Sequence, residues 1–350
     1  MKNMASSKKP LWWVKLTNYE YWPMFTFYSP TLYYLIYLFI KSRSLTFFSL
    51  ANPVEEFGSF FGESKVKALA KIAAKYKPQS IDVPLNTDFE DIMVKLQEKQ
   101  IDYPFIIKPN WGERGVNVSK VHNEAELKDY LAKTDRDSII QEFVDYPIEI
   151  GVFYYRHPTK KESAITGIVV KQFLTVIGDG HSTIRALMEQ SDRARFQIER
   201  LRNKFPDMDS RVLANGEQLL LEPIGNHNRG TMFLDGSDKI NDSMVKVFDD
   251  VASTIDGFYY GRFDVKIKDW ESIYNGNLKI LEVNGVYSEP AHIYDPTKWK
   301  LIPAYKEIIK HYKLMYEISE ANKKRGFKPA SAKFIWHIAR KNYFKNKQLV

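Results

Sequence analysis

The stretch Gly261-Arg262-Phe263-Asp264-Val265-Lys266, followed by Leu281-Glu282-Val283-Asn284-Gly285, decides the expected fold. Both runs have the apolar and polar alternation of strands, and the connector between them contains Asn275-Gly276, a strong turn signal. We therefore expect two antiparallel strands. Because strand side chains alternate between faces, Glu282 and Asn284 share one face, which Asp264 reaches from the partner strand.

Two carboxylates and an amide oxygen on one face are hard oxygen donors of the kind that Mg²⁺ binds, with Mn²⁺ as an alternative. Asp264, Glu282 and Asn284 are therefore the expected metal ligands. Arg262 stands two residues from Asp264, so its guanidinium would lie beside the site and stabilise negative charge on a tetrahedral intermediate. The alternative is that these acids pair with neighbouring bases at a sheet edge.

A second motif lies upstream, where Lys108 closes the apolar run 104–107 and precedes Pro109-Asn110-Trp111-Gly112-Glu113-Arg114-Gly115. A lysine at a strand end contacts phosphate as a point charge, and Gly112 and Gly115 let backbone N–H groups approach the phosphate closely. An ordinary surface turn is the alternative. The pattern GxxxxGK[ST] is absent from the sequence, so this is not a Walker A loop.

A third motif is Gln141-Glu142-Phe143-Val144, with Glu149 a short distance beyond. An extended hinge at Glu142, Phe143 and Val144 can offer backbone groups to an adenine edge, and Glu149 can accept hydrogen bonds from ribose hydroxyls. A solvated acid is the alternative for Glu149.

The rest of the chain alternates between helix and strand patterns. We expect strands over 45–50, 105–108, 138–143, 148–155, 165–177, 259–267 and 278–283, and helices over 31–40, 65–76, 87–98, 123–131, 183–204 and 242–255.

Composition narrows the choice of function. The chain has 350 residues, enough for two or three subdomains, and contains no cysteine, which excludes disulfides and thiol nucleophiles. Its net charge of +8 is concentrated in residues 321–350, which hold nine Lys or Arg and no acid. This tail, with an amphipathic pattern over 327–343, fits an anionic membrane surface or a helix docked on the protein, and no nucleic-acid motif accompanies it.

Residues 21–40 carry no charge and include nine aromatic side chains, but Pro23 and Pro30 interrupt the run. Three readings stay open: contact with a membrane interface, docking onto the protein itself, and a transmembrane span. No secretory signal pattern precedes the run. We therefore expect a cytoplasmic protein, with attachment at the inner membrane face as the alternative.

Taken in order, these motifs resemble the ATP-grasp superfamily, and most closely its D-alanine–D-alanine ligase-like carboxylate–amine ligases, over residues 62–295. The resemblance implies an α+β and α/β fold in which two α+β subdomains sandwich ATP, after a short N-terminal α/β segment. It implies that ATP and Mg²⁺ are bound. The implied nucleotide contacts are Lys65, Lys108, Gly112, Gly115, Glu142, Phe143, Val144, Glu149 and Lys171, with catalysis by Arg262 and Lys171 and metal binding by Asp264, Glu282 and Asn284.

The expected organisation follows from this resemblance. It consists of an aromatic-rich segment (1–44), a truncated region before the ATP-grasp core (45–100), a small lid subdomain (101–160), a C-terminal catalytic subdomain (161–320) and a basic tail (321–350).

Two departures from the family bear on the substrate. The family's lid carries serines where this chain reads Trp111-Gly112-Glu113-Arg114-Gly115, and its glycine-rich stretch after the metal asparagine is replaced by residues 285–292. The resemblance therefore does not extend to D-alanine as the substrate. Residues 176–184 are similar to a segment of cyanophycin synthetases. The candidate substrate contacts are Arg114, Asn226, Arg229, Ser288 and His292.

The expected function is an ADP-forming ligase that activates a small-molecule carboxylate as an acyl phosphate and joins it to an amine or thiol. A small-molecule kinase on the same fold is the first alternative, and a non-catalytic, membrane-associated nucleotide-binding protein is the second. The sequence is compatible with a homodimer.

Overall fold

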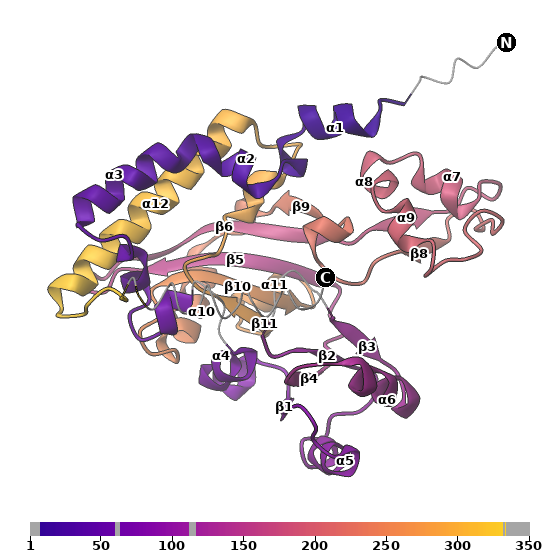
Figure 1. Ribbon diagram of the computed structural model, residues 1–350, viewed down its shortest axis with the longest axis horizontal. Coiled ribbons are helices and arrows are strands. Elements are labelled where there is room, and N and C mark those ends of the chain that lie inside the picture. The colour runs from indigo at the N-terminus through magenta and orange to yellow at the C-terminus, as the bar shows by residue number, and fades with distance from the viewer. Residues whose placement is uncertain (1–7, 60–63, 112–116, 332, 334–350) are drawn as a thin grey trace.

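Two antiparallel β-sheets, each covered by helices, form the body of the molecule (Figure 1). The structure is a computed structural model that describes residues 8–59, 64–111, 117–331 and 333. Its mixed helix and strand content and its antiparallel sheets confirm the expected α+β fold class.

The smaller sheet has four strands in the order β1-β4-β2-β3, and two helices pack on it through an apolar core. Helix α6 begins where the Asn123 side chain accepts a hydrogen bond from the Glu126 N–H (3.0 Å). Lys108, in β2, and Gln141, in β4, stand on the two central strands, and the register of these strands puts both side chains on one face of the sheet. The elements are β1 (Ser80–Val83), α5 (Phe89–Glu98), β2 (Phe105–Pro109), β3 (Ser119–Val121), α6 (Glu124–Lys133) and β4 (Ser138–Glu142).

The larger sheet has five strands in the order β11-β10-β5-β6-β9. Phe263 and Val265 point from β10 into a core formed with α10, whereas Tyr260 points to the opposite face, against α12. Strand alternation therefore puts Arg262 and Asp264 on the same face of the sheet as Tyr260. The α12 helix covers Tyr260, whereas Arg262 and Asp264 line a cavity. The elements are β5 (Ile148–Arg156), β6 (Ser163–Gln172), β9 (Met232–Asp235), α10 (Asp242–Ser253), β10 (Tyr260–Ile267), α11 (Trp270–Tyr274), β11 (Leu278–Asn284) and α12 (Leu301–Lys324).

A third apolar cluster lies in the segment between β6 and β9. Thr183 caps the first helix of this segment by accepting a hydrogen bond from the Ala186 N–H (3.2 Å), but the helix expected over 183–204 is divided into α7, α8 and α9. The elements are β7 (Thr175–Ile177), α7 (Ile184–Met188), α8 (Asp192–Arg195), α9 (Ile198–Leu201) and β8 (Gln218–Leu220).

The N-terminal segment docks along one edge of the molecule, where α3 lies beside α12 (Figure 1). Helix α4 begins at Lys65, and the Ser64 hydroxyl accepts the Lys67 N–H (3.3 Å) as its cap. In the described ranges, no helix is both long enough and apolar enough to cross a membrane. The helices are α1 (Leu11–Thr17), α2 (Met24–Tyr28), α3 (Leu32–Ser42) and α4 (Lys65–Lys71), with 3-10 turns η1 (Tyr19–Tyr21), η2 (Ser29–Thr31), η3 (Phe47–Ala51), η4 (Glu56–Ser59), η5 (Ala74–Tyr76), η6 (His227–Arg229), η7 (Ser237–Lys239) and η8 (Ala291–Tyr294).

Several sequence predictions need correction. Residues 45–50 were expected to form a strand, but 47–51 form the 3-10 helix η3, so residues 8–59 contain helices joined by turns and no strand. Strand β5 belongs to the larger sheet, so the two sheet units divide between Glu142 and Ile148 instead of at residue 160. Helix α12 runs to Lys324, past the expected start of the tail, and residues 327–331 are not helical. Residues 334–343 of the expected tail helix lie outside the described residues.

Candidate active site

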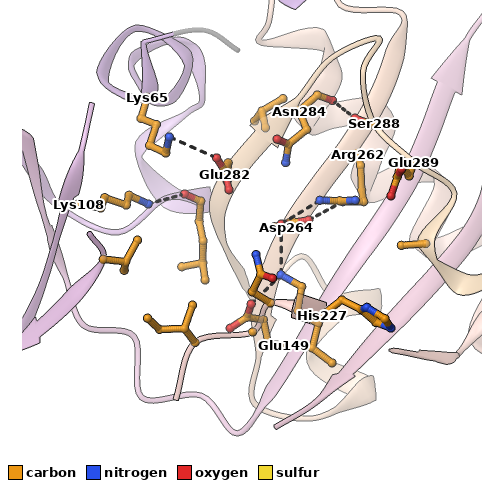
Figure 2. Close-up of a pocket in the computed structure, with 18 of the residues that line it drawn as sticks. Lys65, Lys108, Glu149, His227, Arg262, Asp264, Glu282, Asn284, Ser288 and Glu289 are labelled. Carbon is orange, nitrogen blue, oxygen red and sulfur yellow. Dashed lines mark hydrogen bonds and ion pairs between the residues drawn. The ribbon is translucent and has the colours of Figure 1, made fainter. Parts of the chain in front are cut away.

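A cavity of about 790 Å³ lies between the two sheets, within the usual size range of small-molecule sites. Figure 2 shows Lys65 and Lys108 entering from the smaller sheet's side and facing Glu282, Asn284, Arg262 and Asp264 on β10 and β11. The structure thus brings together residues that are widely separated in the sequence. The predicted site residues that line the cavity are Lys65, Lys108, Glu142, Phe143, Val144, Glu149, Lys171, Asn226, Arg262, Asp264, Glu282, Asn284 and Ser288.

The expected pairing of β10 with β11 sets the positions of the oxygen donors. Arg262 stands opposite Asn284, and Asp264 stands opposite Glu282, with an irregularity in the pairing just after Asp264. All four side chains line the cavity, as strand alternation predicted.

Asp264 lies between two cations. Arg262 donates from Nε to Asp264 Oδ1 (2.7 Å) and from Nη2 to Oδ2 (3.3 Å), and Lys171 Nζ donates to Oδ2 (3.2 Å). Burial by itself would raise the pKa of Asp264, but the charges of Arg262 and Lys171 outweigh it and lower the pKa to about 2. Lys171 also donates to Glu149 Oε1 (2.8 Å), and Asp264 and Glu149 together raise the lysine pKa against the effect of burial.

Glycine at position 151 makes room for this cluster. Gly151 is opposite Asp264 on β5, and a Cβ there would lie 3.2 Å from Asp264 Oδ1, 3.0 Å from Arg262 Cδ and 2.8 Å from Val169 Cγ1. Any side chain at this position would therefore displace the Arg262–Asp264 pair or the neighbouring strand.

Two lysines reach the larger sheet from the opposite wall. Lys65 Nζ, from the first residue of α4, lies 3.6 Å from Glu282 Oε1. Lys108 Nζ donates to Gln141 Oε1 (3.0 Å) and to the Leu281 carbonyl (3.2 Å). Burial lowers the pKa of Lys108 to about 8, partly offset by the charge of Glu282. The ammonium group is therefore largely charged at neutral pH.

The expected hinge forms one wall of the cavity. The Glu142 carboxylate accepts the Gln79 N–H (3.0 Å), and the Val144 carbonyl accepts a hydrogen bond from Lys266 Nζ (3.0 Å). The Phe143 ring has the Lys266 ammonium 5.3 Å from its centroid, a cation–π contact. The hinge therefore presents both polar groups and an aromatic face.

The donor set suits a hard divalent cation bound together with a polyphosphate. In the described ranges there is no group of three or more His, Asp or Glu side chains placed to hold a metal. A metal at this site would therefore be held by the carboxylates of Asp264 and Glu282 together with the Asn284 side-chain oxygen. Asn284 Nδ2 and Gln141 Nε2 are buried at the cavity without a hydrogen-bond partner. A bound polar ligand would satisfy both groups, so the residues fit the expected ligands.

The candidate substrate contacts divide into three groups. Asn226 and Ser288 line the cavity, although Ser288 Oγ donates to the Asn284 carbonyl (2.8 Å). Arg229 and His292 do not line the cavity, contrary to expectation. Arg229 forms an ion pair with Glu222 (3.8 Å). His292 is buried against Trp299, and this burial lowers the pKa of His292 to about 4. Arg114 lies outside the described residues, as do Gly112 and Gly115, which were predicted as nucleotide contacts.

Sequence reasoning missed several residues that line the cavity. Lys266 could have been found, because it continues the two-residue period of Arg262 and Asp264. Tyr21, Trp22 and Met24 could not, because their place depends on how the N-terminal segment docks. Other lining residues that were not predicted as site residues are Glu20, Gln141, His227, Phe233, Glu289 and Tyr294.

Comparisons with known proteins find a local sequence likeness, and no protein-family model matches the chain. Over 61 residues, 17% of the chain, it is 39% identical to a D-alanine–D-alanine ligase of Acetivibrio thermocellus. Over 55 residues, 15% of the chain, it is 40% identical to a D-alanine–D-alanine ligase of Marinomonas sp.. These matches span only 16% and 17% of the two ligases, about a sixth of their length. The likeness agrees with the resemblance expected from the motifs.

Two solved structures are also similar to this chain. The D-alanine–D-alanine ligase from Bacillus anthracis gives a TM-score of 0.41 at 15% identity, covering 77% of this chain and 68% of that one. A bifunctional glutathione synthetase from Pasteurella multocida gives a TM-score of 0.40 at 16% identity, covering 74% of this chain and 38% of that one.

Proposed function

We propose that the protein is a magnesium-dependent ligase that uses ATP to convert a substrate carboxylate into an acyl phosphate and joins it to an amine. The observation that carries this proposal is the meeting of Asp264, Glu282 and Asn284 with Lys65 and Lys108 across one cavity. Oxygen donors on one wall and ammonium groups on the other suit a polyphosphate accompanied by a hard divalent cation.

The nucleotide would lie between the sheets. Lys65 and Lys108 would contact its phosphate oxygens in place of their present partners, Glu282 and the Leu281 carbonyl. The hinge 142–144 would hold the adenine edge, and Glu149 would accept hydrogen bonds from the ribose.

Asp264, Glu282 and Asn284 would hold Mg²⁺, which neutralises phosphate charge during transfer. A carboxylate oxygen of the substrate attacks the γ-phosphorus, and the bond to the bridging oxygen breaks as ADP leaves. The amine then attacks the acyl carbon, phosphate leaves with the electron pair, and the nitrogen loses a proton. Arg262, held by Asp264, would stabilise the negative oxygen of the tetrahedral intermediate.

The first test is ATP turnover with Mg²⁺ and pooled amino acids and hydroxy acids, with product masses recorded. Release of ADP and phosphate that depends on the acceptor, with a mass gain that matches condensation, would support the ligase. A thiol acceptor would appear as a thioester mass. A stable product heavier by one phosphoryl group would overturn the proposal in favour of a kinase. A chain that shows no Mg·ATP binding by calorimetry would overturn it altogether.

A matched pair of variants separates the site from the fold. Glu282→Gln keeps the shape of the side chain but removes a proposed metal ligand, so we expect loss of nucleotide turnover with the fold intact. Glu98→Gln makes the same change at an exposed position on α5 and serves as the control. Equal turnover in both variants would contradict the assignment.

A further inference from the structure

The N-terminal segment exposes an unusual amount of apolar surface. In the part of the chain that the structure describes, more than half of the large apolar side chains that are exposed lie between residues 12 and 45. Helix α1 contributes Trp12, Trp13 and Leu16, and α2 contributes Phe25, which is 81% exposed. Scattered apolar side chains on a surface are ordinary, but a concentration in one segment indicates an interaction surface.

Helix α3 shows the pattern most clearly. Its exposed residues Tyr33 (64%), Ile36 (54%), Tyr37 (49%) and Ile40 (73%) are spaced i, i+3, i+4 and i+7, so they form one stripe along the helix. The opposite side packs inward, because Leu38 is 1% exposed and α3 lies against α12. A helix on the surface of a globular protein would ordinarily present polar residues where this stripe lies.

The three helices follow one another along the same edge of the molecule (Figure 1). We call the exposed apolar side chains on them the apolar edge. The members of the apolar edge are Trp12, Trp13, Leu16, Met24, Phe25, Tyr33, Ile36, Tyr37 and Ile40.

The exposed charges that the N-terminal segment itself carries are basic, although Lys8 faces Glu189, the residue after α7 (3.9 Å). Residues 8–54 contain five bases and a single acid, Glu20. Glu20 is turned inward, where its carboxylate pairs with Arg193 and with His227 Nε2 (3.3 Å), so it adds no negative charge to the surface. Lys15, Lys41 and Arg43 are exposed, and Lys41 lies over the Tyr37 ring (5.6 Å).

We propose that the apolar edge docks on an anionic lipid surface, with α1–α3 lying in the plane of the headgroups. Trp and Tyr favour the boundary between headgroups and acyl chains, Ile and Leu insert below it, and Lys and Arg bind anionic headgroups. The exposed bases of this segment, which carries no exposed acid of its own, favour this occupant over a second copy of the chain, whose own bases would repel them. Met24, in α2, is partly exposed and also lines the cavity, so the docked surface begins at the cavity rim.

The test is co-sedimentation with vesicles of phosphatidylserine and phosphatidylcholine, compared with vesicles of phosphatidylcholine alone. We expect binding to the anionic vesicles to be at least tenfold stronger and to weaken as salt is added. This comparison uses the unaltered chain, so it does not depend on how any variant folds. Equal or absent binding to both kinds of vesicle would overturn the proposal.

A matched pair of variants locates the surface. The double variant Ile36→Glu/Ile40→Glu places two acids on the stripe, and we expect its binding to anionic vesicles to fall at least tenfold. Val94→Glu on α5 is the control, because Val94 is exposed to the same extent as Ile36 (54%) but lies outside the apolar edge, and its binding should stay within twofold of wild type. Equal binding by the double variant and the control would overturn the proposal. So would a dimer in sedimentation velocity that the double variant dissociates.

Discussion

Asp264 and Glu282 are both proposed metal ligands, but their surroundings imply that replacing Asp264 destabilises the fold far more than replacing Glu282 does. Asp264→Asn would remove a buried carboxylate from between Arg262 (2.7 Å) and Lys171 (3.2 Å), leaving two buried cations undercompensated. The Glu282 side chain is 35% exposed, and Lys65 Nζ lies 3.6 Å from its Oε1. We therefore expect Asp264→Asn to cost both stability and turnover, and Glu282→Gln to cost turnover alone.

The magnitude follows from the pKa of Asp264. Burial raises this pKa, but Arg262 and Lys171 lower it from 3.8 to about 2, a difference that corresponds to about 2 kcal/mol of stability at neutral pH. Breaking a buried pair from one side costs about 3–5 kcal/mol in general. We expect Asp264→Asn to lower the free energy of unfolding by about 2–5 kcal/mol, and Glu282→Gln to change it by less than about 1 kcal/mol.

Urea denaturation followed by circular dichroism measures both variants against wild type. Because the folded pKa of Asp264 lies below the unfolded one, its contribution is complete above about pH 4 and is lost as the pH falls towards 2. The gap between wild type and Asp264→Asn should therefore be constant from pH 5 to 7 and narrow between pH 4 and 3. An Asp264→Asn variant as stable as wild type at pH 7, or a gap that widens in acid, would refute the reasoning.

Three further predictions concern the cavity. Lys108→Met should weaken ATP binding roughly 10–100-fold. We expect wild-type affinity to fall above about pH 8, where the Lys108 ammonium group is lost, and this fall should be absent in the variant; the same pH dependence in both proteins by calorimetry would contradict this. Gly151→Ala should lower the free energy of unfolding by about 1–3 kcal/mol and lower turnover roughly tenfold or more, because the added Cβ would lie 2.8 Å from Val169 Cγ1. Wild-type turnover by this variant in steady-state assays would contradict the prediction. Trp22→Ala should raise the KM of the acceptor and leave that of ATP unchanged, since Trp22 packs against the apolar cluster of α2, η8 and α12 and not on the strands β4 and β5 that precede and follow the hinge. Equal changes in both KM values would contradict this assignment.

The sequence predicted the β10–β11 part of the site because that part depends on local rules. Strand alternation put Glu282 and Asn284 on one face, and the Asn275-Gly276 turn signal implied that the two strands pair. The connector nevertheless contains the short helix α11, which its polar composition did not indicate. Lys108 was found because it closes a clear apolar strand.

Other parts depend on tertiary contacts that a single sequence does not encode locally. The apolar run 45–50 fits a strand by composition, yet residues 47–51 form η3, which packs on α12, and just after it the Asn52 Oδ1 accepts the Tyr260 N–H (3.0 Å). Arg229 stands in a polar glycine-bearing loop that suggested a substrate contact, but it pairs with Glu222 of the same β8–β9 connection (3.8 Å) and does not line the cavity. The place of Trp22 at the cavity follows only from the docking of the N-terminal segment.

The transfer of ¹⁸O tests the central claim, activation of a carboxylate as an acyl phosphate, most directly. A carboxylate substrate and an amine that together support turnover are supplied, with both oxygens of the reacting carboxylate labelled. The released phosphate is then analysed by mass spectrometry. The account predicts one ¹⁸O atom in each phosphate, because the oxygen that attacks the γ-phosphorus leaves with it when the amine attacks the acyl carbon. Unlabelled phosphate, with one ¹⁸O atom in the amide product and the other in water, would contradict it.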